Sequence, residues 1–407
     1  MALIVQKYGG TSVGTPERIL NVAQRILETQ AAGNEVVAVV SAMSGVTDQL
    51  IRLARQVSKN PTEREMDVLL ATGEQTTIAL VAMAINGLGG KAASLTGAQA
   101  GIVTDGRHTR AKIANITPRQ IRSLLHEGNI CVVAGFQGQT AGGQITTLGR
   151  GGSDLTAIAI AGALHADNCE IYTDVDGVFT CDPRIVPKAR KIDEIAYDEL
   201  LEMASSGSKV MQSRSVEFAK KFGVLFEVRS SFHKGRGTIV KEESAGLEDV
   251  VVRGISVERH QAKVTIHGVP DRPGAASRIF SVLAESNVVV DVIVQNVSLS
   301  GTTDISFTIN RDELDKVGPR LDEVAREIGA LGVIRKDGVA KLSVVGIGMR
   351  SHSGVAARLF EVLAAGGINI QMISTSEIKI AVILEESRIE EAARLAHTGF
   401  GLDAEDE

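Results

Sequence analysis

The chain has 407 residues, of which 44% are hydrophobic and 23% are charged, so it is long enough for two or three domains with buried cores. A net charge of −6, no basic stripe, no Trp and only 3% aromatic residues argue against nucleic-acid binding. The N-terminus lacks a basic leader, and no run reaches the roughly 18 uncharged apolar residues that would cross a bilayer. We therefore expect a cytoplasmic protein without a membrane partner.

Cysteine and histidine give no sign of a disulfide framework or a metal site. The three cysteines, Cys131, Cys169 and Cys181, are too few and too scattered to form a set of bridges. The eight histidines show no metal-ligand spacing with each other or with cysteine. The sequence predicts reduced thiols and no metal held by the protein alone.

The first residues predict a strand, a glycine loop and a helix. An apolar strand over 3–7 precedes Tyr8-Gly9-Gly10-Thr11-Ser12, and Thr15 and Pro16 have the types expected at the N-cap and first turn of a helix. Paired glycines let backbone N–H groups approach a phosphate, and the helix start adds a positive dipole end. Lys7 stands beside this expected anion site. Taken alone, the segment is equally compatible with an ordinary turn.

A second glycine loop, Leu148 to Asp154, follows an apolar run over 130–136 and precedes a small-residue helix over 155–164. Ser153 or Asp154 can cap that helix. Two glycine loops that each open a helix suggest that a polyanion binds between two helix N-termini. Neither loop has the Gly-x-x-x-x-Gly-Lys-[Ser/Thr] pattern, and no Gly-x-Gly-x-x-Gly occurs, which argues against a Walker loop and a dinucleotide enzyme.

Strand and helix patterns alternate through the first half of the chain. Further strands are expected at 35–40, 92–95, 130–135 and 170–173, with helices at 47–57, 63–85 and 118–126. This order predicts an α/β fold with a mainly parallel sheet covered by helices on both faces. Ligands of such sheets bind beyond the carboxyl ends of the strands, where the motif residues fall.

An internal repeat occupies the last third of the chain. Residues 230–249 read as turns and a linker, so we expect a first domain over 1–232, a linker over 233–249 and a second region over 250–407. In that region similar residues recur 80 positions apart, as in Gly274 with Gly354 and Phe280 with Phe360. Helix patterns at 313–328 and 389–397 complete two ferredoxin-like βαββαβ units.

Five motifs in this order resemble the aspartate kinase group of the amino acid kinase family. They are Lys7-Tyr8-Gly9-Gly10-Thr11-Ser12, Ser41-Ala42-Met43-Ser44-Gly45-Val46-Thr47-Asp48, Gly73-Glu74, Gly149-Arg150-Gly151-Gly152-Ser153-Asp154 and Tyr172-Thr173-Asp174-Val175-Asp176-Gly177. The resemblance implies transfer of the γ-phosphoryl group of ATP to the side-chain carboxylate of L-aspartate. The product would be 4-phospho-L-aspartate, at the first step of lysine, threonine and methionine synthesis.

The resemblance also implies roles at a nucleotide site. Lys7 and Lys209 would lie along the ATP phosphates, and Asp154 would orient the lysines or the attacking group. Mg²⁺ would bridge the phosphates. Without the resemblance, Lys209 is an ordinary surface lysine and Asp154 a helix cap. The remaining nucleotide contacts implied are Tyr8, Gly9, Gly10, Thr173, Asp174, Phe179 and Arg184.

An amino acid with two carboxylates and one ammonium would bind next to the phosphates. Arg150 can hold a carboxylate in a bidentate clamp, and Glu74 can pair with the ammonium. Glu74 could otherwise be an exposed charge on a helix. The remaining substrate contacts implied by the resemblance are Ser41, Thr47, Gly151, Gly152 and Ser153.

The repeats resemble tandem ACT domains, which sense small molecules. In the family one repeat is embedded in the other, which implies a first repeat over about 263–335 and a second formed by 250–262 with 336–400. Candidate contacts for lysine or threonine as effectors are Asp271, Gly274, Ala276, Gln295 and Asn369. The resemblance implies a homo-oligomer joined through these domains and, as in some relatives, a separate regulatory subunit. The alternative is that the repeats only dimerise.

Two other functions fit the same motifs. One is a related kinase acting on glutamate, acetylglutamate or a nucleoside monophosphate. The other is a catalytically silent amino-acid sensor in which the glycine loops hold nucleotide structurally. Lys7, Asp154 and Lys209 argue against the silent sensor, because it would not need that set of charges.

Overall fold

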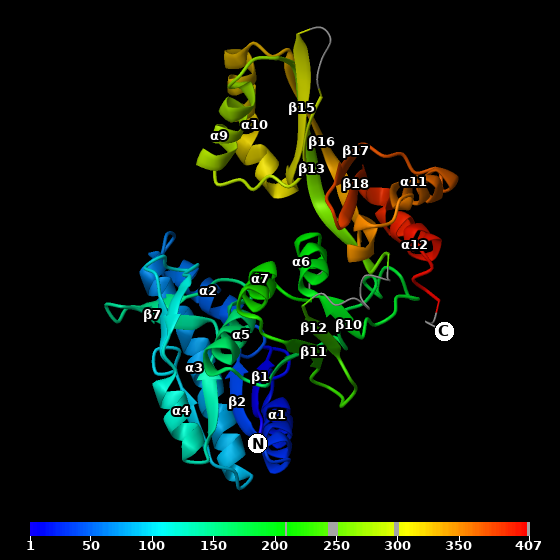
Figure 1. Cartoon of the computed structure of the whole chain (residues 1–407). Helices are drawn as coiled ribbons and strands as arrows, with labels where there is room; N and C mark the ends of the chain where they lie inside the picture. Colours follow the sequence, from blue (N-terminus) through cyan, green and yellow to red (C-terminus); the bar gives the residue numbers. More distant parts are fainter. Residues whose placement is uncertain (208–209, 243–250, 297–300, 405–407) are drawn as a thin grey trace. The chain divides into compact units, whose positions relative to one another are not determined.

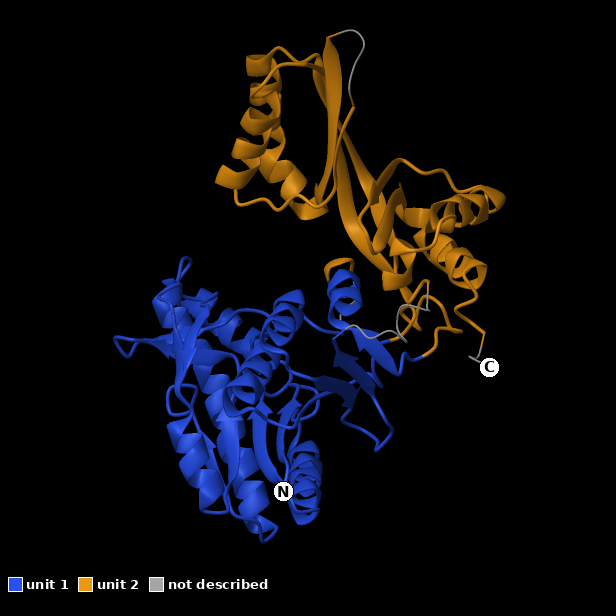
Figure 2. Ribbon diagram, in the orientation of Figure 1, with its two compact units in different colours: residues 1–178, 191–204, 209–244 blue, residues 179–190, 205–208, 245–407 orange. Residues whose placement is uncertain are grey.

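A computed structural model of the chain describes residues 1–207, 210–242, 251–296 and 301–404 (Figure 1). Unit 1 comprises Met1–Val178, Lys191–Ala204 and Lys209–Ser244, and unit 2 comprises Phe179–Arg190, Ser205–Ser208 and Ala245–Glu407 (Figure 2). The segment Phe179–Arg190 thus belongs to unit 2, whereas the sequence predicts an unbroken first domain over 1–232. Residues 243–249 of the expected linker lie outside the described residues.

Unit 1 is built on an eight-stranded sheet with the order β10-β12-β11-β9-β1-β2-β6-β3. Its strand pairs are parallel except for β11 with β12, which confirms the mainly parallel sheet. The strands are β1 (Leu3–Tyr8), β2 (Glu35–Val40), β3 (Ala92–Leu95), β6 (Ile130–Ala134), β9 (Asn168–Thr173), β10 (Glu194–Ala196), β11 (Phe226–Ser230) and β12 (Thr238–Lys241).

Helices cover both faces of this sheet. On one face α1 (Pro16–Ala31) and α3 (Glu63–Gly87) pack their apolar stripes on β2 and β6, through residues such as Ile26, Ile85 and Val132. In a second layer, α4 (Arg119–His126) contacts β2 and β6, and α5 (Gly152–Leu164) contacts β1, β2 and β9. As predicted, Thr15 caps α1, because its side chain accepts a hydrogen bond from the Arg18 N–H. The other helices are α2 (Val46–Val57), α6 (Tyr197–Ser205) and α7 (Ser213–Phe222).

Helix α3 is long and apolar enough, by length and composition, to cross a membrane. Half of its most apolar 18-residue stretch is buried inside unit 1. There the helix contacts α1, α2 and the sheet, and it carries the buried carboxylates of Asp67 and Glu74. Core packing therefore explains the apolar character of this helix.

A small four-stranded sheet, which the sequence did not predict, completes unit 1. Its order is β5-β4-β7-β8, with β4 (Ile102–Thr104), β5 (Ile113–Ile116), β7 (Gln137–Thr140) and β8 (Ile145–Thr147). Each of these strands has only three or four residues and includes Thr, Asn or Gln, so no apolar run marks them in the sequence. The buried hydroxyls of Thr104 and Thr146 lie 2.6 Å apart and join β4 to β8 across this sheet.

Unit 2 contains the two predicted βαββαβ repeats on one six-stranded sheet, with the order β14-β15-β13-β16-β18-β17. The first helices of the repeats, α9 (Ala275–Glu285) and α11 (Val355–Ala365), have the same length and start 80 residues apart, as the repeat predicts. Among the described residues, the other strands and α-helices of unit 2 are β13 (Gly254–Pro270), β14 (Ile293–Gln295), β15 (Thr302–Asn310), α10 (Leu314–Ile328), β16 (Gly332–Val345), β17 (Met372–Thr375), β18 (Lys379–Glu385) and α12 (Ile389–Gly399).

The long strands β13 and β16 connect the repeats. Residues 254–258 of β13 pair with 341–345 of β16, and residues 263–267 pair with 332–336. The start of β13 therefore belongs with the second repeat. Within unit 2, Cys181 and Val186 of the segment 179–190 are buried in the core of that repeat, and the Thr180 hydroxyl lies 2.9 Å from Nε2 of His397 on α12.

Lys341 on β16 is a buried charge at this junction. Its side chain is 1% exposed and forms ion pairs with Glu258, at 2.8 Å, and with Asp291. Burial is the largest influence on its pKa and lowers it, but the two carboxylates together raise the pKa of Lys341 above its ordinary value. The ion pairs therefore keep this lysine charged inside the sheet.

Candidate active site

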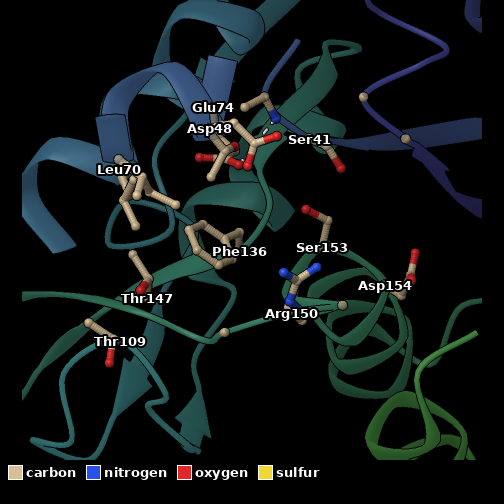
Figure 3. Close-up of a pocket in the computed structure, with 18 of the residues that line it drawn as sticks. Ser41, Asp48, Leu70, Glu74, Thr109, Phe136, Thr147, Arg150, Ser153 and Asp154 are labelled. Carbon is tan, nitrogen blue, oxygen red and sulfur yellow. Dashed lines mark hydrogen bonds between the residues drawn. The ribbon is translucent and has the colours of Figure 1, made fainter. Parts of the chain in front are cut away.

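A pocket of about 550 Å³ opens in unit 1 beyond the carboxyl ends of β1, β2 and β6 (Figure 3). Both glycine loops border it, together with residues from α2, α3 and α5. Parallel strands end at the same edge of a sheet, so motifs far apart in the sequence meet here. The pocket brings together eleven of the predicted site residues, which are Lys7, Gly9, Gly10, Ser41, Thr47, Glu74, Arg150, Gly151, Gly152, Ser153 and Asp154.

Lys7 and Asp154 form an ion pair at this edge. The Lys7 Nζ lies 2.6 Å from Oδ1 of Asp154, and the side chains are 10% and 13% exposed. Strand β1 delivers the lysine, and the first turn of α5 delivers the carboxylate. A lysine held in this way presents a fixed positive charge at the glycine loop after β1.

The predicted capping of α5 by Ser153 or Asp154 is wrong. Gly151 occupies the N-cap position, and no side chain donates or accepts a capping hydrogen bond there. The Gly152 N–H instead donates to the carbonyl of Gly149 at 3.0 Å. Asp154 is thus engaged with Lys7 rather than with the start of its own helix.

The loop that carries Arg150 is tightly braced. Gly149 and Gly151 have φ angles of 77° and 70°, in the left-handed region that glycine adopts without strain. The Arg214 guanidinium on α7 donates to the carbonyls of Leu148 and Ala111, at 2.8 Å each. Arg150 itself is exposed, and in Figure 3 its guanidinium lies beside Ser153 in the pocket. A planar fork in this place can bind a carboxylate or phosphate through two hydrogen bonds.

Glu74 is buried, not the exposed helix charge that was the alternative. Its side chain comes from the middle of α3, and the residue is 4% exposed. Oε1 accepts a hydrogen bond from the Ala42 N–H at 3.1 Å, and Oε2 has no hydrogen-bond partner among the residues the structure describes. Burial raises the pKa of Glu74 from 4.5 to about 7, although the Ala42 N–H opposes the shift. An unpartnered carboxylate oxygen facing a pocket is suited to a cationic group of a ligand.

Gly73 allows helix α3 to approach the loop that follows β2. A Cβ atom on Gly73 would lie 2.9 Å from the Cβ of Ala42, closer than side chains pack. Only a residue without a side chain lets α3 lie against the loop that follows β2. The glycine before Glu74 in the sequence therefore has a packing reason, and this packing places the carboxylate in the pocket.

Eight residues that line the pocket were not predicted, although some lie inside the quoted motifs. Ala42, Asp48 and Gly149 belong to these motifs and could have been found from them. The others lie on apolar helix faces or beside the short strands of the small sheet, where no motif marks them. They are Ile51, Leu70, Thr109, Phe136 and Thr147.

The predicted nucleotide residues of unit 1 surround the end of β9. Tyr8 is fully buried and its ring stacks on Tyr172, with centroids 4.8 Å apart, so only its backbone can face a nucleotide. Thr173 ends β9, next to β1, and its hydroxyl donates to Asp174 at 3.2 Å. Neither Thr173 nor Asp174 lines the pocket described above.

The other predicted nucleotide residues lie elsewhere. Phe179 and Arg184 belong to unit 2, where Arg184 is exposed and makes hydrogen bonds to Asp182. Lys209 lies outside the described residues.

The predicted effector residues all lie in unit 2. Asp271 and Gly274 precede α9, and Ala276 is in its first turn. Gln295 is the last residue of the edge strand β14, and Asn369 follows α11 in the second repeat. Asp271, Gly274, Gln295 and Asn369 are exposed, and Ala276 is half-buried.

Acidic groups in the pocket are dispersed rather than clustered. Over residues 1–207, 210–242, 251–296 and 301–404, no group of three or more His, Cys, Asp or Glu side chains could hold a metal ion. Three carboxylates line the pocket, those of Asp48, Glu74 and Asp154.

Comparisons with known proteins agree with this architecture. Residues 2–228 match the amino acid kinase family, and residues 263–326 and 342–400 match ACT domains. An aspartate kinase of Pseudomonas putida is 54% identical over 405 residues, which cover 99% of this chain and 98% of the relative.

Solved structures show the same fold. The E. coli aspartokinase III in complex with aspartate and ADP, in its R-state, superposes with a TM-score of 0.80 at 26% identity, covering 98% of this chain and 99% of that one. A T-state structure of the same E. coli enzyme, in complex with lysine and aspartate, has a TM-score of 0.78 at 25% identity and the same coverage. The chain therefore belongs to the aspartate kinases of the amino acid kinase family, a group of phosphotransferases, and carries two ACT domains after its kinase domain.

Proposed function

We propose that the protein transfers the γ-phosphoryl group of ATP to the side-chain carboxylate of L-aspartate and produces 4-phospho-L-aspartate. The observation that carries the proposal is the set of charges in one pocket. Glu74 offers a buried carboxylate oxygen without a partner among the described residues, Arg150 offers a guanidinium, and Lys7 is held by Asp154. This set complements an amino acid with one ammonium and two carboxylates that reacts beside a phosphate.

In this proposal Glu74 pairs with the substrate ammonium and Arg150 clamps one carboxylate. Ser41, Thr47 and Ser153 add hydrogen bonds, and Gly151 and Gly152 allow the ligand to approach the start of α5. Glutamate is longer by one methylene, so its reacting carboxylate would be displaced from the phosphate. Such displacement lowers the rate steeply, because the reacting atoms must lie in near-attack geometry.

The reaction requires positioning and positive charge more than acid or base chemistry. A substrate carboxylate is already ionised at neutral pH, so it attacks without a general base. Lys7, with Gly9 and Gly10, would bind the phosphates, and Asp154 would keep the ammonium of Lys7 in place. Lys209, Thr173, Asp174, Phe179, Arg184 and the backbone of Tyr8 are the further nucleotide contacts of the proposal.

Mg²⁺ fits the pocket as a companion of the nucleotide. The ion needs only one or two protein carboxylates, because phosphates and water supply its other ligands. The dispersed carboxylates of the pocket match that requirement. When bound, Mg²⁺ supplies positive charge to the phosphate oxygens.

The proposal extends to regulation and location. Lysine, threonine or both would bind near Asp271, Gly274, Ala276, Gln295 and Asn369, and would reduce activity through a coupling free energy between the two sites. That the E. coli relative was solved with lysine supports such a ligand. A homo-oligomer joined through the ACT domains, a separate regulatory subunit as in some relatives, and a cytoplasmic location complete the proposal.

The test is release of ADP with ATP, Mg²⁺ and L-aspartate, beside L-glutamate, and repeated with lysine, threonine and both. We expect release that depends on aspartate, stops when EDTA removes Mg²⁺, and falls when an effector is added. Release with glutamate but not with aspartate would overturn the assignment of aspartate as the substrate. Release that neither lysine nor threonine changes would overturn the regulatory role of the ACT domains. No release with any amino acid would favour the silent sensor.

A further inference from the structure

Two residues of the pocket wall, Thr109 and Phe136, have left-handed backbone conformations. Their φ angles are 63° and 67°, in the region that favours glycine. For a β-branched residue such as Thr109 this conformation is a genuine outlier. Strained backbone of this kind persists only where surrounding contacts hold it. The contacts of Thr109 therefore show what fixes this wall.

Asp67 on α3 holds Thr109 in place. The residue is fully buried and does not line the pocket. The Thr109 N–H donates to both carboxylate oxygens of Asp67, at 3.0 and 3.1 Å. The Thr147 hydroxyl donates to Oδ1 at 2.5 Å, and Nδ1 of His108 lies 2.6 Å from Oδ2. One carboxylate thus joins two residues of the pocket wall, which lie close together in Figure 3, to the long core helix.

Thr109 in turn supports the loop that carries Arg150. A Cβ atom on Gly149 would lie 3.3 Å from the Thr109 carbonyl oxygen, so the two backbones pack closely. The Ala111 N–H donates to the carbonyl of Thr147 at 2.9 Å, which continues this contact along the end of β8. A shift of Thr109 would therefore displace Gly149 and, with it, the guanidinium of Arg150.

We infer that Asp67 is a positioning residue for amino-acid binding: by holding the strained backbone of Thr109, it sets the place of the Arg150 loop without touching the substrate. The inference rests on the proposed function, in which Arg150 clamps a carboxylate of aspartate. A buried carboxylate is costly unless donors satisfy it, and here three residues supply them. Two of these donors, the Thr109 N–H and the Thr147 hydroxyl, belong to the pocket wall that Asp67 positions.

A double-mutant cycle tests this link. Glycine adopts a φ of 63° without strain, so Thr109→Gly removes most of the need for an anchor. Asp67→Asn keeps the size of the side chain but loses one acceptor oxygen. We expect Asp67→Asn to raise the KM for aspartate by about tenfold and to change the KM for ATP by less than about twofold. In the Thr109→Gly background the same substitution should raise the aspartate KM by less than about threefold.

Two further variants separate a displacement of the Arg150 loop from a general loss of stability of the fold. Thr104→Val breaks the buried hydroxyl pair with Thr146 in the same small sheet, and Thr104 does not line the pocket. It should lower the melting temperature and leave the aspartate KM unchanged. His108→Ala removes one bond to Asp67 at a partly exposed site, so it provides the test if Asp67→Asn does not fold. It should raise the aspartate KM in the same direction, by about two- to threefold.

The wild-type reaction is measured first. If ADP release does not depend on aspartate, the proposed function fails and this inference fails with it. If the wild type is active, the inference alone is overturned by equal fold-changes of the aspartate KM in the two Thr109 backgrounds. Equal effects of Asp67→Asn on the KM values for aspartate and ATP would also overturn it.

Discussion

The pH dependence of Glu74 gives a direct test of how the pocket works. Glu74 is 4% exposed, and its pKa lies at about 7 because burial disfavours the charged form. Glu74→Gln keeps the shape of the side chain and an oxygen that can accept the Ala42 N–H, but it removes the charge. The variant therefore isolates the free energy of holding this carboxylate ionised in the pocket.

The raised pKa of Glu74 determines whether the stability of the wild type rises or falls with pH. Well below pH 4.5 the carboxyl group is protonated in the folded and the unfolded chain, so it does not change the stability. As the pH rises from 4.5 through about 7, the unfolded chain ionises first, and the wild type loses stability. The rise of the pKa from 4.5 to about 7 corresponds to a loss of about 3 kcal/mol at pH 8. Glu74→Gln has no such loss.

Thermal unfolding of both proteins from pH 5 to pH 8 measures this difference. The melting temperature of Glu74→Gln should rise relative to that of the wild type as the pH increases. A free energy of about 3 kcal/mol corresponds to about 6–12 °C for a domain of this size. Glu65→Gln, on the exposed side of the same helix, is the matched control and should show no such trend. A difference between wild type and Glu74→Gln that is constant across this range would refute the reasoning.

The same group should govern substrate binding. Pairing with an ammonium requires the ionised form of Glu74, so the KM for aspartate should fall as the pH rises through about 7. In Glu74→Gln the KM should be high and should lose this pH dependence. An aspartate KM with the same pH profile in both proteins would show that Glu74 does not bind the ammonium.

Four further substitutions test the other assignments. Lys7→Ala should reduce kcat by at least about a hundredfold in steady-state assays with saturating ATP, and near-normal turnover would exclude its phosphate role. Arg150→Ala should raise the KM for aspartate far more than the KM for ATP, whereas equal increases would rule out the clamp. Gln295→Ala should shift lysine and threonine inhibition curves to higher effector concentration. Identical inhibition curves for the wild type and the variant would show that Gln295 is not part of the effector site. Lys341→Met should lower the stability of unit 2 by about 2–3 kcal/mol in denaturant unfolding, because two carboxylates lose their shared cation; unchanged unfolding would contradict this.

Local and periodic signals made much of the fold predictable. Thr15 and Pro16 mark the start of α1 because capping and a fixed proline φ depend only on neighbouring residues. The parallel sheet follows from the alternation of strand and helix patterns, and the two ACT-like units follow from residues that recur 80 positions apart. Glycine motifs at the ends of strands likewise predicted which loops would meet at the pocket.

Properties that depend on contacts distant in the chain could not be predicted in this way. The sequence alone leaves Glu74 as either a surface charge or a ligand, because its burial results from packing against Ala42, 32 residues away. Asp154 has the position of a helix cap, yet it is engaged with Lys7 on another element. The segment Phe179–Arg190 comes shortly after β9, which ends at Thr173, but it is part of unit 2.

By itself, the sequence determined the order of the elements, the internal repeat and the loops that could bind an anion, since each depends on neighbouring residues or on a regular period. Only the tertiary structure decided which charges are buried and which side chain each one contacts. The bonds of Asp67 to Thr109 and Thr147, 42 and 80 residues away, illustrate this difference. Burial, pairing and the pKa values that follow from them are set by three-dimensional proximity, which no local pattern encodes.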